Sequence, residues 1–382
     1  MSASRFDAVI AGGGLSGLSL AAHLATQGWS DRSVLVVDDA RARPSAVCWG
    51  YWSAEPGLLD AAVSRRYERV RIHAGGSSQL VPLGRYTYHV VRRPDLLSVV
   101  CGMLDRCPGF EIRHGRVELM CDDGDGVNVT VDGETVRAQW VFDSISTPPV
   151  TISSDASLAF TGWDVRYPRP VFDPTTPTLF DFRTRQEEGS RFVYVLPDGP
   201  TRALVELTEF VPRRAQPPSV AERRAALSRY LSDVVRGGEY QILRTESAVL
   251  ALRSRRAGRR HGRIMAIGAA GGMVKASTGY AFTRIQRDSA AIVESLLRRG
   301  HPFAPPPTRS RYRLLDALLL DVLDHDPAQL ELAFARLFAT NPAERVLCFL
   351  DETSRLRDDV RLIASLPPMP YLRALVRRLA GR

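Results

Sequence analysis

The sequence is almost without lysine and has no long apolar run. Lysine and arginine together number 51 among 382 residues, yet Lys275 is the only lysine. The uncharged stretch 8–30 contains three consecutive glycines, His23 and Gln27, which favour a tight-turn motif over a signal peptide or a membrane span. The apolar run 314–323 is about half the length that a span needs, and two aspartates interrupt it. We therefore predict a protein that does not cross the membrane.

Cysteine is also scarce. The five cysteines are an odd number without a CxxC pair, which predicts reduced thiols in a cytoplasmic protein rather than a disulfide framework. Zinc-ligand spacing and basic platforms interleaved with aromatics are missing too, so we predict neither a bound metal nor a nucleic-acid partner. The 45% hydrophobic content and mean hydropathy of −0.12 are typical of a globular chain with two or three domains or one interwoven fold.

A dinucleotide-binding pattern stands at the N-terminus. An apolar strand precedes GxGxxG, a helical repeat follows, and a second apolar strand ends in an acid. The glycines permit the tight turn, the approach of a pyrophosphate and helix–strand packing, while the acid accepts hydrogen bonds from ribose. A purely structural glycine turn is the alternative. The residues predicted to bind the cofactor here are Gly12, Gly14, Leu15, Ser16, Gly17 and Asp38.

A second glycine-rich segment favours FAD over NAD. The expected strand 263–267 leads into glycines and then into a helix expected from Thr278, whose backbone donors would face the flavin pyrimidine edge. Tyr280 is a candidate for facing the substrate. The further residues predicted to bind the cofactor are Gly268, Gly271, Gly272, Met273, Thr278 and Gly279.

The rest of the sequence predicts further helices and strands. Periodicity, hairpin signals at two Asp-Gly pairs and a capping box at Ser219–Glu222 place the other elements. We expect a helix over 94–105, short strands over 110–145, a mostly antiparallel sheet over 155–210, a helix over 219–236, a strand over 240–250 and helices from 278 onward.

Motifs spread over the whole chain resemble those of the FAD-dependent lycopene cyclases, in particular the bacterial lycopene beta-cyclase type of actinobacterial-like sequences. The matching segments are DAVIAGGGLSGLSLA (7–21), VLVVDD (34–39), WGYW (49–52), FTGWDV (160–165), VFDPTTPTLFDFR (171–183), FVYVLP and RALVELT (192–208), GAAGGMVKASTGYAFTRIQR (268–287) and FLDETSRLRDDVRLIASLP (349–367).

The resemblance implies an α/β fold of the flavoprotein-hydroxylase type. A Rossmann-type FAD-binding domain would be interleaved with a substrate domain built on a mixed or antiparallel sheet, and a helical region would follow. The implied boundaries are 1–45, 94–150 and 262–300 for the FAD-binding domain, 46–93 and 151–261 for the substrate domain, and 301–382 for the helical region.

The implied reaction is a proton-initiated, redox-neutral cyclisation of lycopene to a beta-ring carotenoid, with reduced FAD stabilising the cationic transition state and NAD(P)H as a candidate reductant. The motif places the acid at Glu206, and an apolar pocket would keep its carboxyl neutral. An exposed strand residue is the alternative. Lys275 would lie beside the flavin as a stabilising cation, or be an exposed loop residue. Asp351 and Glu352 in FLDET are interpreted as solvated helix residues.

Two stretches depart from the family pattern. Glu246–Leu252 reads ESAVLAL where relatives have E-x-G-V-I-P-M, and Ala276 replaces a proline. These losses leave open a cyclase that acts on a non-carotenoid polyene or polyketide, and a flavin monooxygenase or reductase is a second alternative. Three tryptophans are candidates for stabilising a carbocation through the faces of their rings, or else they pack in the core. They are Trp49, Trp52 and Trp163.

Arginine clusters suggest peripheral contact with the inner face of the cell membrane, where a hydrophobic polyene would be collected, or else solvated surfaces. Leu372 and Leu379 accompany the second cluster. The arginines concerned are Arg253, Arg255, Arg256, Arg259, Arg260 and Arg263 in one loop, and Arg373, Arg377, Arg378 and Arg382 near the C-terminus.

Overall fold

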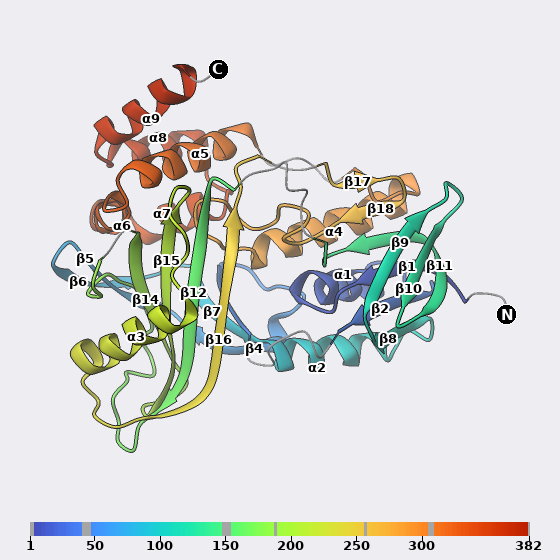
Figure 1. Ribbon diagram of the computed structural model, residues 1–382, viewed down its shortest axis with the longest axis horizontal. Coiled ribbons are helices and arrows are strands. Elements are labelled where there is room, and N and C mark those ends of the chain that lie inside the picture. The colour runs from blue at the N-terminus through green and yellow to red at the C-terminus, as the bar shows by residue number, and fades with distance from the viewer. Residues whose placement is uncertain are drawn as a thin grey trace.

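The computed structural model describes residues 4–39, 47–146, 154–186, 189–255, 258–304 and 309–380. Two sheets lie at opposite ends of an elongated molecule, and the C-terminal helices cover the end that holds the second sheet (Figure 1). Arg256 and Arg382, two of the arginines predicted to meet a membrane, lie outside the described residues.

The first sheet contains the predicted strand–turn–helix–strand opening. Its path is β17-β18-β11-β1-β2-β8, with β1 parallel to both β11 and β2. The hairpin β9–β10 pairs with β11 and covers one face, while α1, α2 and α4 cover the other. The bounds are β1 Arg5–Ala11, α1 Leu15–Thr26, β2 Val34–Asp38, α2 Arg93–Leu104, β8 Phe110–His114, β9 Val117–Asp122, β10 Val127–Val131, β11 Glu134–Asp143, β17 Arg260–His261, β18 Ile264–Ala266 and α4 Phe282–Arg299.

Burial on both faces explains why the second half of β1, residues 8–11, is apolar at every position. Ala8 and Ile10 pack under the helices, whereas Val9 packs under the β9–β10 hairpin. Because successive side chains of a strand point to opposite faces, a strand covered on both sides is apolar at every position.

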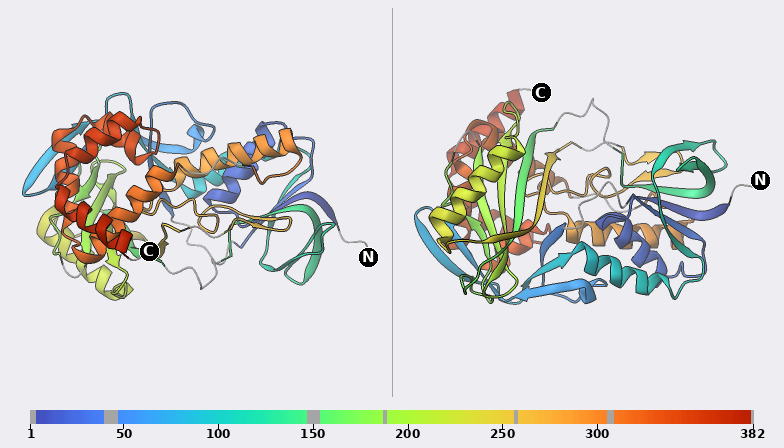
Figure 2. Two further views of the ribbon diagram at one scale, coloured as in Figure 1. Left: turned by 90° about the horizontal axis from the view of Figure 1, so that it is seen from above. Right: turned by 60° about the horizontal axis from the view of Figure 1, so that its bottom comes forward.

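The second sheet is the long antiparallel one predicted for 155–210, extended at both edges. Its order is β16-β12-β15-β14-β13-β5-β6, and a small sheet β3-β7-β4 stands beside it. Strands β5 and β6 come from the 46–93 segment, so two distant parts of the sequence share this sheet (Figure 2). The bounds are β3 Cys48–Ser53, β4 Val63–Tyr67, β5 Arg69–Ala74, β6 Ser77–Pro82, β7 Thr87–Arg92, β12 Ala156–Arg166, β13 Thr178–Asp181, β14 Ser190–Pro197, β15 Arg202–Pro212, α3 Val220–Tyr230 and β16 Gln241–Leu252.

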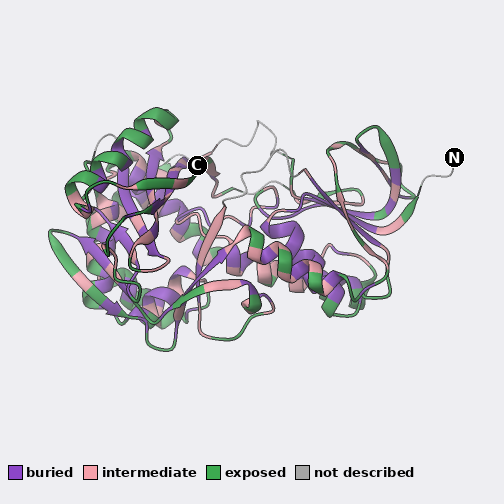
Figure 3. Ribbon diagram, turned by 90° about the horizontal axis from the view of Figure 1, so that it is seen from below, coloured by how far each residue is buried: buried purple, intermediate pink, exposed green. Residues whose placement is uncertain are grey.

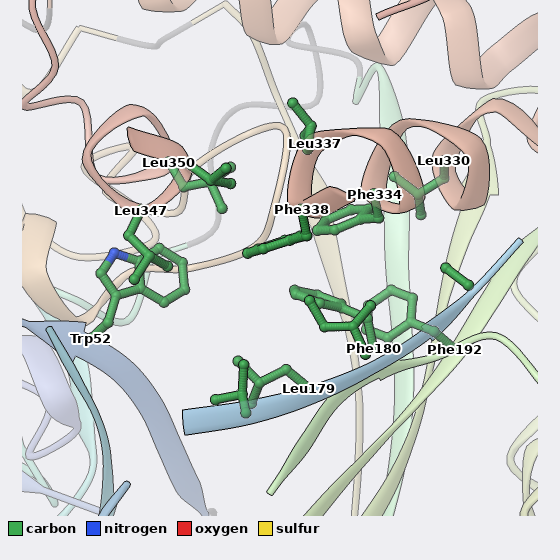
Figure 4. Close-up of a cluster of buried hydrophobic side chains, with 14 of the residues drawn as sticks. Trp52, Leu179, Phe180, Phe192, Leu330, Phe334, Leu337, Phe338, Leu347 and Leu350 are labelled. Atoms are coloured by element: carbon green, nitrogen blue, oxygen red, sulfur yellow. The ribbon is translucent and has the colours of Figure 1, made fainter. Parts of the chain in front are cut away.

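Different elements cover the two faces of this sheet. Val205 and Leu207 of β15 are fully buried against Leu227 of α3. On the opposite face, Phe180 and Phe192 pack on Phe334 and neighbouring side chains of α6 and α7 (Figure 4). The helical region consists of α5 Ser310–His325, α6 Gln329–Thr340, α7 Ala343–Leu350, α8 Leu356–Ala364 and α9 Pro368–Ala380.

Most predicted elements are confirmed to within a few residues, including the capping box, in which Ser219 and Glu222 exchange hydrogen bonds. The helix expected from Thr278 is wrong in its start, because α4 begins at Phe282. Gly279 has φ +75° and its amide bonds back to the Lys275 carbonyl, which holds this segment in a turn. Within the described residues, no helix is both long and apolar enough for a transmembrane segment.

Candidate active site

A cavity of about 470 Å³ lies between the two sheets. Its wall includes Gly14, Leu15 and Ser16 where α1 begins, and Thr278–Phe282 from the segment before α4. Strands β12, β14, β15 and β16 supply the opposite wall. The predicted dinucleotide turn and the second sheet therefore share one space.

The glycines of the turn are required by close packing. A Cβ on Gly17 would lie 1.9 Å from the carbonyl oxygen of Gly12, so a side chain there cannot fit. Gly12 itself has φ +106°, a conformation that favours glycine. Gly14 caps α1 without any side-chain hydrogen bond, which leaves the first-turn amides of the helix directed at the cavity end. This is an arrangement that accepts a pyrophosphate.

The second glycine-rich segment meets the first one. Gly268 has φ +59°, and a Cβ there would lie 2.0 Å from Oγ of Ser16. A Cβ on Gly271 would likewise lie too close to its surroundings, at 2.5 Å from the carbonyl oxygen of Ala266. Gly272 is a third turn position with φ +73°. Predicted residues from two parts of the sequence thus form neighbouring turns, although Met273 is 5% exposed and packs in the core of the first sheet.

Asp38 lies at the end of β2, as predicted, and is 2% exposed. Arg93 at the start of α2 donates a 2.6 Å hydrogen bond to its Oδ2 and also lines the cavity. Gly13 passes so close that a Cβ there would lie 2.5 Å from the Asp38 carboxyl carbon. The acid is therefore fixed against the glycine turn, where an adenosine ribose would lie.

Glu206 points into the cavity from β15. Its neighbours Val205 and Leu207 face α3, so strand alternation turns Glu206 to the other side. The residue is half-buried, and the area it exposes faces the cavity. Thr208 donates to Oε1 at 3.3 Å. Burial raises the pKa of Glu206 to about 7, so a neutral carboxylic acid is available near neutral pH.

A second carboxyl, Glu246, meets Glu206 across the sheet. Both residues pair in register with Gly162 of the intervening strand β12. Gly162 makes room for them, because a Cβ there would lie 3.0 Å from Oε1 of Glu246. Glu246 is 7% exposed, and burial together with the neighbouring Glu206 raises its pKa to about 9. The two carboxyls influence each other's protonation, because the charge of Glu206 helps to raise the pKa of Glu246.

Glu246 occupies the glutamate position of the family motif, and its spacing along the chain predicts no catalytic role. Its partnership with Glu206 depends on strand order, since β12 separates β15 from β16 and the two acids are 40 positions apart in the sequence. Ser247, Ala248 and Leu250, within the departure at 246–252, also line the cavity. Ala276 instead packs in the core beside the helical region.

Aromatic side chains form part of the wall. Tyr194 of β14 and Tyr280 are hydrogen-bonded through their hydroxyls at 3.1 Å. Tyr280 also packs edge-on against Trp52, with ring centroids 4.6 Å apart. Trp49 lines the cavity as well. Trp163 does not face it and packs with Leu227 beneath α3, so its predicted π-face role is wrong and the core interpretation holds.

Lys275, predicted to act as a cation beside the flavin, is not part of the cavity wall. Its Nζ binds Asp316 of α5 at 2.8 Å and Glu352 at 3.0 Å, and the residue is 3% exposed. It is therefore neither an exposed loop residue nor a cation directed at the cavity, because two carboxylates from the helical region balance its charge.

The interpretation of Asp351 and Glu352 as solvated helix residues is corrected. Both follow the end of α7, and their side chains are only 17% and 10% exposed. Glu352 binds Arg284 at 2.6 Å as well as Lys275. Asp351 accepts from Thr283 at 2.6 Å. The FLDET segment thus anchors the helical region to α4, and it does not line the cavity.

A family model described as "Lycopene cyclase protein" matches residues 7–376. The chain belongs to the lycopene cyclase family. No curated protein matches it in a sequence search.

Solved structures share the fold at low sequence identity. A flavoprotein/dehydrogenase from Cytophaga hutchinsonii has a TM-score of 0.65 and 14% identity, covering 99% of this chain and 100% of that one. The p-nitrophenol 4-monooxygenase of Pseudomonas putida DLL-E4 has 0.62 and 17%, with coverages of 92% and 99%. A halogenase variant solved in complex with FAD has 0.55 and 14%, with coverages of 90% and 79%. The predicted flavoprotein-hydroxylase-like fold is confirmed.

Proposed function

We propose that this lycopene cyclase family member catalyses the redox-neutral, proton-initiated cyclisation of a polyene end group, with lycopene as substrate and a beta-ring carotenoid as product. One observation carries the proposal: a carboxyl pair, the half-buried Glu206 and the buried Glu246, lies in the same cavity as the dinucleotide turn. Protonation of an unactivated alkene requires an acid kept neutral in apolar surroundings, which this environment provides.

The turn residues fit FAD. The uncapped start of α1 at Gly14–Ser16 would hold the pyrophosphate, Asp38 the ribose, and the segment around Thr278 and Gly279 the ring system. Reduced FAD, when bound, would supply negative charge that stabilises a cationic transition state, with NAD(P)H as the candidate reductant.

The chain's own residues account for the proton chemistry. Glu206 donates its proton to the terminal double bond of the polyene, and the resulting cation is attacked by the internal double bond, which closes the ring with a new carbon–carbon bond. A ring carbon then loses a proton to the Glu206 carboxylate, which restores both a double bond and the acid. One proton enters and one leaves, so the reaction needs no oxidant. Leu158, Phe160 and Leu204 beside Glu206 exclude water that would trap the cation.

Tyr194 and Tyr280 would contribute aromatic faces near the cation, since their rings lie in the wall that also holds Glu206. Burial raises the pKa of both phenols, so the rings stay neutral. A neutral phenol cannot act as a base that intercepts the proton of Glu206.

Expression in a lycopene-accumulating bacterium tests the proposal. We expect wild type to form a cyclic carotenoid, and Glu206→Gln to lower its yield by about 10²–10⁴-fold, the usual contribution of a general acid. Glu134→Gln is the matched control, because that side chain is 82% exposed on β11. Unchanged lycopene with folded wild type would refute lycopene as the substrate.

A non-carotenoid polyene or polyketide is the second candidate substrate. It is favoured by Ser247, Ala248 and Leu250, which line the cavity within the stretch that departs from the family motif. If wild type leaves lycopene unchanged, restoring the family's Gly, Pro and Met at 248, 251 and 252 should create lycopene cyclisation under this alternative.

A flavin monooxygenase or reductase is the third candidate, favoured by the shared fold alone. Such an enzyme would consume NAD(P)H in proportion to product, with no need for Glu206. Anaerobic mixing with NAD(P)H, followed by admission of oxygen and product analysis in wild type and Glu206→Gln, separates it from a redox-neutral cyclase.

We further propose that α8 and α9 dock on an anionic membrane, from which the substrate is collected. Figure 3 shows exposed and half-buried positions along the outer C-terminal helices. Their exposed apolar residues are Leu356, Val360, Ile363, Met369, Leu372, Val376 and Leu379, which are 36–65% exposed. Arg357, Arg361, Arg373 and Arg378 are interspersed among them, and this combination is typical of helices that lie in a membrane interface.

The loop predicted as the other basic cluster is less suited to this role. Arg259 binds Asp288 at 2.6 Å, and Arg260 lies over the Phe303 ring at 4.4 Å. Flotation with phosphatidylglycerol vesicles should therefore be reduced by Leu372→Ser with Val376→Ser, and not by Leu119→Ser, a 60% exposed leucine on β9. Equal flotation of all three proteins would refute docking through α9.

A further inference from the structure

The first turn of α4 has an inner and an outer face. Phe282 and Ile285, three positions apart, line the cavity of the candidate active site together with Tyr280, which precedes the helix. Thr283 and Arg287, four positions apart, are not part of that wall. Because a helical turn is held together by its own backbone, a contact on the outer face also sets the position of the inner one.

Asp351, which follows α7, binds the outer face of this turn. Its Oδ1 accepts a 2.6 Å hydrogen bond from Oγ1 of Thr283, and Nη2 of Arg287 lies 3.1 Å from the same oxygen. The Arg287 side chain is 45% exposed, whereas that of Asp351 is 17% exposed. An ion pair with so exposed a partner contributes little, so the bond with Thr283 is the firmer contact.

The backbone of the neighbouring Glu352 shows that this point of the chain is held in place. Glu352 has φ +62°, a left-handed conformation directly after the end of α7, where glycine is the usual residue. Its carboxylate binds Lys275 at 3.0 Å and Arg284 at 2.6 Å. A left-handed glutamate persists where the surrounding contacts determine its position, and these ion pairs are such contacts. Asp351 is therefore a fixed point to which α4 is tied.

Close packing is incomplete behind the wall at this turn. A second cavity, of about 10 Å³, has Tyr280, Phe282, Thr283 and Asp351 among its lining residues. Each of the two rings packs on one aromatic neighbour. Atoms that face a void nevertheless lack packing partners on that side. The void thus gives the turn room to shift when the bond between Thr283 and Asp351 is lost.

We infer that Asp351 is a positioning residue: through Thr283 it holds the first turn of α4, and with it Tyr280, in the wall of the polyene site. In the proposed function, on which this inference rests, the Tyr280 ring lies near the cation. That contact is made in the transition state, so a displaced Tyr280 slows the chemical step more than it weakens substrate binding.

Fluorine NMR of the FAD-saturated protein, labelled with fluorotyrosine, tests the positioning without any substrate. Tyr280→Phe identifies the Tyr280 resonance by its loss. In Thr283→Val, which removes the hydroxyl and keeps the shape of the side chain, that resonance should shift or split in two. Thr283→Ser keeps the donor and should leave the resonance in its wild-type position. Thr175→Val is the matched control, because Oγ1 of Thr175 donates to Oδ1 of Asp173 at 2.7 Å in an exposed turn.

Turnover supplies a second measurement when wild type is active. Thr283→Val should lower kcat about tenfold to a hundredfold with little change in KM, and Thr283→Ser should restore it. Asp351 keeps Arg287 as a partner in both variants, so both should fold.

A Tyr280 resonance that does not move in Thr283→Val would overturn the inference, whether or not lycopene is the substrate. A lower Tm with unchanged kcat would show a merely structural bond and would overturn it as well. If the resonance moves as expected in a protein that makes no cyclic product, the proposed function is refuted and the positioning by Asp351 is supported.

Discussion

Replacement of Glu246 by glutamine should make the protein more stable at neutral pH. Burial beside Glu206 raises the pKa of Glu246 from the ordinary 4.5 to about 9. A carboxyl with a raised pKa binds its proton more tightly in the folded protein than in the unfolded chain. Its contribution to the free energy of unfolding is therefore complete below the unfolded pKa and falls as pH rises toward the folded pKa.

The size of this stability effect follows from the difference between the unfolded and the folded pKa of Glu246. At pH 7 the unfolded carboxyl has lost its proton and the folded one has kept it, which costs the folded state about 1.4 kcal/mol for each pH unit above 4.5. The cost at pH 7 is thus about 3 kcal/mol. Glutamine has nearly the same shape, does not titrate and can donate to Glu206, so Glu246→Gln removes this cost.

Urea unfolding between pH 5 and pH 8 measures the effect, with both proteins at equal FAD saturation because bound cofactor adds its own stabilisation. The free energy of unfolding of Glu246→Gln should exceed that of wild type by about 3 kcal/mol at pH 7, and by much less at pH 5. A difference that does not vary with pH, or a variant less stable than wild type at pH 7, would refute the buried neutral carboxyl.

Three further results are expected. Cyclase activity should decline as pH rises through about 7, because Glu206 then loses the proton that it must donate, and a flat profile from pH 6 to pH 9 would argue against this acid. Gly162→Ala should slow cyclisation about tenfold to a hundredfold by displacing Glu246, with circular dichroism unchanged, and full activity would show that the carboxyls need no such fit. Lys275→Met should destabilise the protein by about 3 kcal/mol, because the buried Asp316 carboxylate loses its lysine partner while Glu352 keeps Arg284, and the absorption spectrum of bound flavin should not change. A spectral shift with normal stability would restore the predicted role beside the flavin.

Local patterns were sufficient for the dinucleotide half of the site. Gly12, Gly17 and Asp38 lie close together along the chain, and their roles follow from turn geometry that a short segment adopts by itself. Alternation along β15 likewise predicted that Glu206 points away from Val205 and Leu207. One face of β15 packs against α3 and the other faces the cavity. Which face would do which depended on elements distant in the sequence.

Long-range pairing decided the remainder. Lys275 follows the predicted flavin-binding turn in sequence, yet Asp316 and Glu352 from the helical region draw its ammonium group away from the cavity. The FLDET segment, by contrast, is buried by the contacts of its acids with α4 and the segment before it. Neither set of partners is visible from spacing, because charge pairing over 41 or 77 positions depends on how the helices pack.

Residue types and short spacings along the chain were sufficient to predict a protein rich in arginine and poor in lysine, with a dinucleotide turn, an antiparallel sheet and one acid on an apolar strand. These features follow from residue type and from the spacing of apolar residues, which repeats every two positions in a strand and about every four in a helix. Both patterns can be recognised within a single element. The meeting of Glu206 with Glu246 across Gly162 required the folded sheet, because the order of strands in a sheet is fixed by packing between elements that are distant in the chain.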